Sequence, residues 1–195
     1  MLKTVTEKIA VRIDWTKNAS GNYDVQIVMN SGDFFATGPS IRSKIQRFKN
    51  KYFDLIEESK KLAKTKNKKG RKFTAKHWWR LGKLLNDFNH EIGGQFVISN
   101  YTMAIARDLH GFEMSDTEVG VLGQFANYFK RDDVSEHIPI AYYREFCWKA
   151  NQLIDLNIIE KEKENLLRMS ENGTLGNHKK YREYLKEKIS NGGRN

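Results

Sequence analysis

Lysine and arginine are concentrated in one stretch of the chain, between Arg42 and Lys83. The stretch holds sixteen of these residues against three carboxylates, an excess of thirteen positive charges, whereas the whole chain of 195 residues carries +10. Each cation can pair with a phosphate and release a condensed counterion, and this chemistry depends on the number and density of cations more than on their spacing. Because the remainder is slightly acidic, the sequence predicts that a polyanion binds at this stretch.

The expected contacts lie on two predicted helices and on the loop that joins them. The loop reads KTKNKKGRK over residues 64–72 and contains no apolar side chain, which is typical of an exposed segment. A tryptophan is included because it could stack on an unpaired base. The predicted contact residues are Arg42, Arg47, Lys49, Lys51, Lys64, Lys66, Lys68, Lys69, Arg71, Lys72, Lys76, Trp79, Arg80 and Lys83. The alternatives are a solvated helix face with a soluble loop and, for the loop alone, a nuclear localisation signal.

Residues 101–129 form a candidate helix-turn-helix. In this interpretation Gln124 and Asn127 read base edges, and Gly111 makes the turn. Two features depart from the motif: the interval before the second helix is long, and that helix opens with Asp116 and Glu118, which would repel phosphate. An ordinary pair of packed helices is the alternative.

Signals for catalysis are poor. The five histidines are scattered, the single cysteine cannot form a zinc site by itself, and neither a phosphate-binding glycine loop nor a metalloprotease helix is present. A nuclease could use Asp14 and Asp24, and a strand-transfer enzyme could use Tyr143, but neither pattern is specific. We therefore expect no enzymatic activity, no cofactor and no metal.

Alternating apolar residues predict a β-hairpin near the N-terminus. Residues 8–15 and 23–29 each place apolar side chains at every second position, and residues 33–36 could add a third short strand. A lone hairpin is only marginally stable, so we expect it to pack on helices.

Helical spacing of apolar residues begins after Pro39. Thr74 is a candidate N-cap, and Ser115 with Glu118 forms a candidate capping box. The predicted helices cover about residues 39–63, 74–92, 101–109, 115–129, 139–156, 160–169 and 178–189.

These elements predict an α+β protein that is mainly α, with a hairpin of two or three short strands on a bundle of about six helices. The hairpin would span residues 1–37 and the helical domain residues 38–195, together forming one compact unit. Twenty-three aromatic residues argue against general disorder, and Cys147 is expected in the core. No segment has the length and apolar character of a signal peptide or membrane span, so we expect a soluble intracellular protein without a membrane partner.

The sequence therefore favours a non-catalytic DNA-binding protein, acting in regulation, partition or replication of DNA. The alternatives are a module that binds RNA or an acidic protein and, less favoured, a nuclease or strand-transfer enzyme. A homodimer would follow if the helix pair reads a symmetric site. The expected location is the cytoplasm, on the nucleoid, or the nucleus if the source is eukaryotic.

Overall fold

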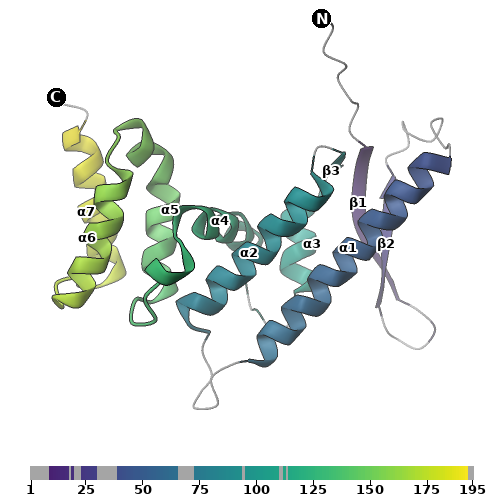
Figure 1. Cartoon of the computed structure of the whole chain (residues 1–195), viewed down its shortest axis with the longest axis horizontal. Coiled ribbons are helices and arrows are strands. Elements are labelled where there is room, and N and C mark those ends of the chain that lie inside the picture. The colour runs from purple at the N-terminus through teal and green to yellow at the C-terminus, as the bar shows by residue number, and fades with distance from the viewer. Residues whose placement is uncertain are drawn as a thin grey trace, which may run out of the picture. The chain divides into compact units, whose positions relative to one another are not determined.

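The computed structural model describes residues 9–17, 19, 23–29, 39–65, 73–93, 95–109, 112 and 114–192. Within these ranges the chain forms seven α-helices and a three-stranded sheet near the N-terminus (Figure 1). The predicted α+β class, dominated by helix, is confirmed.

The chain divides into two compact units. The first comprises residues 1–65 and 84–120, and the second comprises residues 66–83 and 121–195. Two helices, α2 (Ala75–Ile92) and α4 (Asp116–Tyr128), contribute residues to both units. The domain boundary expected at residue 38 stays a prediction.

The predicted hairpin forms part of the first unit. Strands β1 (Ile9–Lys17) and β2 (Tyr23–Met29) pair antiparallel. Val11 and Ile13 are fully buried, and Arg12 between them is exposed, which confirms the alternation read from the sequence. The hairpin is thus apolar on one face, as packing on helices requires.

A third strand, β3 (Phe96–Ile98), pairs parallel with the other side of β1 and was not predicted. Three residues are too few to show a period of two, so the sequence carried little signal. The strand expected over residues 33–36 lies outside the described residues.

The side chain of Asn100 continues the sheet beyond the end of β3. Its amide oxygen accepts the Ile13 N–H at 3.0 Å, and its amide nitrogen donates to the Ile13 carbonyl at 2.7 Å. Both backbone groups of a buried strand residue are therefore satisfied where the strand ladder has ended.

Helix α1 (Pro39–Lys64) packs its apolar stripe against α2 and β3. The Phe48 ring lies 5.8 Å from that of Phe88 and 4.9 Å from that of Phe96, measured between ring centroids. Phe48 and Tyr52 are fully buried, as their helical spacing predicted. Figure 1 shows α1 running beside α2 and the strands.

A buried carboxylate joins α1 to α3 (Tyr101–Asp108). Asp108 is fully buried, accepts a short hydrogen bond from the Tyr52 hydroxyl, and pairs with Arg107 Nε at 2.8 Å. Burial, followed by the charge of Asp108, raises the pKa of Tyr52 far above its ordinary range. The phenol therefore stays protonated and donates to the carboxylate.

The second unit contains the end of α4, a short 3-10 helix, η2 (Arg131–Asp133), and three further helices. These are α5 (Ile140–Asp155), α6 (Ile159–Glu171) and α7 (His178–Gly192). All three were predicted to within a few residues. Pro139, predicted as an early residue of its helix, is the N-cap residue that precedes α5.

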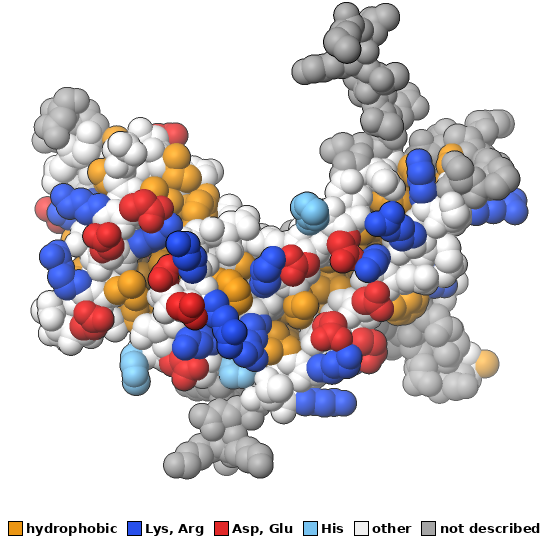
Figure 2. Space-filling model, viewed as in Figure 1, with side chains coloured by type: hydrophobic (Ala, Val, Ile, Leu, Met, Phe, Trp, Pro, Cys, Tyr) orange, Lys and Arg blue, Asp and Glu red, His pale blue; other side chains and the backbone are white. Residues whose placement is uncertain are grey.

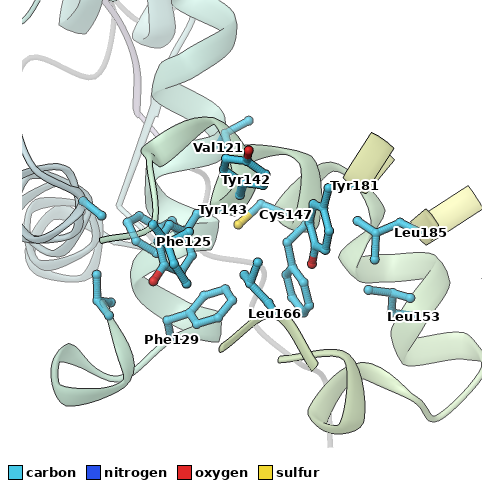
Figure 3. Close-up of a cluster of buried hydrophobic side chains, with 14 residues drawn as sticks. Val121, Phe125, Phe129, Tyr142, Tyr143, Cys147, Leu153, Leu166, Tyr181 and Leu185 are labelled. Carbon is cyan, nitrogen blue, oxygen red and sulfur yellow. The ribbon is translucent and has the colours of Figure 1, made fainter. Parts of the chain in front are cut away.

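Aromatic side chains form the centre of the second unit (Figure 3). The ring centroid of Tyr143 lies 4.6 Å from that of Phe125 and 5.0 Å from that of Phe129. Cys147 is 3% exposed in the same cluster, and burial raises the pKa of its thiol to about 12. Its predicted place in the core is confirmed.

Buried carboxylates in this unit also have partners. Glu145 is 3% exposed and receives two hydrogen bonds from the Arg182 guanidinium. Glu162 accepts from the Tyr184 hydroxyl at 2.7 Å and from the Asn165 amide at 3.1 Å. Such satisfied pairs specify how α5 and α6 pack on α7.

Candidate nucleic-acid interface

The N-terminal half of α1 presents basic side chains in the first unit. Arg42, Lys44 and Arg47 are exposed because the apolar stripe of the helix faces the other way, into the core. No ion pair among the described residues involves any of the three. Lys44 was not among the predicted contacts, but it is exposed like Arg42 and Arg47.

Two further predicted contacts on this half, Lys49 and Lys51, are half-buried. The Lys51 ammonium lies 2.9 Å from Glu91 of α2, and the Lys49 ammonium lies 5.8 Å from the centre of the Phe53 ring. Lys51 is therefore partly neutralised, whereas Lys49 keeps its full charge beside an aromatic face.

The C-terminal half of α1 is different because two of its lysines lie one helical turn after glutamates. The ammonium of Lys60 lies 2.7 Å from Glu57, and that of Lys61 lies 2.6 Å from Glu58. The hydrogen bond and charge of Lys60 hold the pKa of Glu57 below its usual range. In Figure 2, red side chains gather over this half of α1 and blue ones over the other.

Cations near the N-terminal ends of α1 and α2 interact unfavourably with the helix dipole. Neither α1 nor α2 has an acidic residue in its first turn, and Arg42 and Lys76 lie near the positive ends. Cations at such positions lower helix stability. A bound polyanion would offset that cost.

The predicted basic contacts on α2 belong to the second unit. Lys76 is half-buried, whereas Arg80 and Lys83 are exposed on the same face of α2. Before them, the Thr74 hydroxyl lies 2.8 Å from His77 Nδ1, and the Thr74 N–H donates to the same nitrogen at 3.3 Å. These contacts tie the residue before the helix to its first turn.

Trp79 packs against the core of the second unit. Its indole N–H donates to the Phe129 carbonyl at 2.7 Å, and the ring is half-buried. Trp79 was predicted to offer its ring to an unpaired base, but the ring packs against this core together with that of its neighbour Trp78. A role in stacking on bases is correspondingly less favoured.

Lys64 is the exposed last residue of α1 rather than part of the loop. The other predicted loop contacts lie outside the described residues: Lys66, Lys68, Lys69, Arg71 and Lys72.

The two helices of the candidate helix-turn-helix are both present, as α3 and α4. They are separated by residues 109–115, longer than the three- or four-residue turn of the motif, and the predicted turn residue Gly111 is outside the described residues. The carboxylate of Glu118 accepts the N–H and the hydroxyl of Ser115 at 2.7 and 3.1 Å, and the first of these bonds is one half of the predicted capping box. Gln124 is half-buried and Asn127 exposed.

Metal ligands and a nucleophilic tyrosine were considered as catalytic signals in the sequence. No group of three or more histidine, cysteine or carboxylate side chains there is placed to hold a metal ion. Tyr143 is fully buried and accepts the Ser135 N–H at 2.9 Å, so its hydroxyl is not placed to attack a phosphodiester.

None of the described helices combines the length and apolar character needed to cross a bilayer.

Comparisons with protein-family models, with curated proteins and with solved structures found no significant match to this chain. Its function must therefore be inferred from the charge, exposure and contacts of its own side chains. One feature that sequence reasoning missed is a pocket beside β3, because its lining residues come from three elements and share no motif.

Proposed function

We propose that this chain is a non-catalytic nucleic-acid-binding protein that binds DNA through the basic residues of the 42–83 stretch. The observation that carries the proposal is the difference within α1: Arg42, Lys44 and Arg47 are exposed without an ion pair among the described residues, whereas Lys60 and Lys61 are paired with glutamates. Unpaired cations release the most counterion when they meet phosphate.

The direction of charge along the helices supports the same proposal. Cations near the start of α1 and α2 lower helix stability, so their presence is better explained by a bound anion than by folding. Regulation, partition and replication of DNA all remain compatible with it, and so do a cytoplasmic or nuclear location and a homodimer.

The proposal is tested by binding the purified chain to duplex DNA, single-stranded DNA, structured RNA and polyglutamate over a range of salt concentrations. DNA binding should fall linearly in log affinity with log salt, by orders of magnitude between about 50 and 200 mM if six or more phosphates are contacted. Tighter binding to RNA or to polyglutamate would favour the alternative of an RNA- or acidic-protein-binding module. Absence of salt-dependent binding to every nucleic acid would refute the proposal.

A further inference from the structure

The first unit contains a pocket of about 250 Å³ at the edge of the sheet. It is lined by Asn89, Ile92, Gly93, Phe96, Ile98 and Tyr101. Clefts that bind drug-sized ligands typically enclose roughly 300–1,000 Å³. This pocket therefore suits a single heterocyclic ring better than a larger ligand.

One wall of the pocket is aromatic and held in place. Phe96 and Ile98 lie on the face of β3 that matches the buried face of β1, yet both are only half-buried because the pocket opens beside them. Behind Phe96, the Phe48 ring lies 4.9 Å away at 50° and is itself fully buried. A half-exposed ring on a rigid support is a platform on which a base can stack.

Two polar groups lie at the same pocket. The Asn89 amide nitrogen donates to the Tyr101 hydroxyl at 3.1 Å. No other hydrogen bond among the described residues uses the hydroxyl proton of Tyr101 or the amide oxygen of Asn89, so both can meet a ligand. Burial raises the pKa of Tyr101 to about 12, so the hydroxyl remains a donor at neutral pH. One donor and one acceptor beside a stacking wall match the hydrogen-bonding edge of a base.

The buried ring of Phe48 links the basic half of α1 to a wall of this pocket. Lys44 is one helical turn before Phe48, whose ring contacts the pocket wall at Phe96. Two turns after Lys44, on the same side of α1, Lys51 pairs with Glu91 between the pocket residues of α2. A phosphate at Lys44 would thus lie one helical turn from the residue that supports the pocket wall, and Lys51 offsets the charge of Glu91.

From this arrangement we infer that the pocket accepts an unpaired base of a single-stranded nucleic acid whose phosphates are bound by the N-terminal half of α1. The inference rests on the proposed function. A duplex keeps its bases stacked inside, so it would use the cations without the pocket.

The test compares three DNA ligands at one salt concentration: a single-stranded 12-mer, a 12-mer sugar-phosphate chain without bases, and a duplex. All present phosphates, but only the first offers unpaired bases. The wild-type chain should bind the base-containing strand about tenfold more tightly than the abasic strand, as expected for one stacked base. Equal affinity for these two strands would overturn the inference.

Variants then assign the preference to the pocket. Asn89→Ala with Tyr101→Phe removes the polar groups, and it should lower the preference for bases about fivefold while abasic binding is unchanged. Phe96→Leu keeps an apolar wall without its ring, and it should lower the same preference. Circular dichroism and a thermal melt establish that each variant is folded.

The second unit provides a matched control, since the Tyr128 hydroxyl lies 3.4 Å from the Asn151 amide oxygen in another Asn–Tyr pair. Tyr128→Phe with Asn151→Ala should keep the preference for bases. If the folded pocket variants keep it as well, the pocket is not the base site. If none of the three DNA ligands binds, the duplex included, the proposed function itself fails. That result is distinct from equal binding of the base-containing and abasic strands.

Discussion

The N-terminal half of α1 carries five cations and the C-terminal half three, and the two halves place most of them in different surroundings. In the N-terminal half, Arg42 and Arg47 are exposed and lack an ion pair among the described residues. In the C-terminal half, Lys60 and Lys61 each reach back to a glutamate three residues earlier. A count of positive charge therefore overstates the surface that can bind phosphate, and the pattern of carboxylates decides which half is available.

The largest expected effect comes from the stretch that has no carboxylate at all, residues 66–72. Changing Lys66, Lys68, Lys69, Arg71 and Lys72 to glutamine should weaken DNA binding by orders of magnitude, similarly for all sequences. The salt slope should decrease by about 0.9 for each phosphate that the variant no longer neutralises. Fluorescence anisotropy at several salt concentrations measures both the affinity and the slope. Unchanged affinity would remove this stretch from the contact surface.

The middle of α1 should affect stability without affecting DNA binding. Tyr52→Phe leaves the buried carboxylate of Asp108 with one donor fewer, which should lower the free energy of unfolding by about 1–3 kcal/mol. The salt slope of DNA binding should not change. Urea denaturation and the binding assay, run on the same variant, separate the two properties; a change in slope would contradict the division.

The pH dependence of Tyr52 gives the same variant a second readout. The pKa of Tyr52 in the folded chain is raised above the ordinary value of about 10. The protonated phenol therefore contributes stability that is fully present below pH 10. This stability is lost as the pH rises above 10, because the unfolded chain then releases the proton while the folded chain keeps it. Tyr52→Phe should therefore lose less stability between pH 9 and pH 11 than the wild type. A parallel loss in both would exclude Tyr52 as the source.

Releasing the paired lysines should make the C-terminal half resemble the N-terminal half. Glu57→Gln with Glu58→Gln removes the partners of Lys60 and Lys61, so DNA affinity should rise several-fold and the salt slope should steepen by up to about 2. As a control, Asp132→Asn with Asp133→Asn removes the same charge from η2 in the second unit. An equal gain in the control would mean that only net charge matters.

The smallest effect concerns the helix dipole. Arg42→Glu replaces a cation with an anion in the first turns of α1 and should raise the free energy of unfolding by about 0.5–1 kcal/mol while weakening DNA binding. Thermal denaturation at low salt measures the gain. Loss of stability instead would show that Arg42 serves the fold.

Periodicity predicted much of this fold. The stripe through Phe48 and Tyr52 and the alternation at Val11 and Ile13 are strong repeating signals, and both are confirmed by burial. By contrast, β3 is three residues long, and its pairing with β1 joins segments far apart in the sequence. Such long-range pairing leaves no local pattern to read.

The candidate site was only partly predictable, for a physical reason. The position of the basic residues is visible in the sequence, but the pairing of Lys51 with Glu91 depends on how α1 packs against α2. Trp79 was predicted to stack on a base, although its indole ring packs against the core of the second unit together with that of Trp78. Exposure and pairing are tertiary properties, and charge counting does not contain them.

The central claim is tested most directly by two variants of α1 that lose the same charge. Arg42→Gln with Arg47→Gln and Lys60→Gln with Lys61→Gln each remove two cations from one helix. In a salt titration of DNA binding, the first variant should lower the slope of log affinity against log salt by about 2, whereas the second should leave it nearly unchanged. Equal slopes in the two variants would contradict the account, because binding would then follow net charge rather than the exposed cations Arg42 and Arg47 at the start of α1.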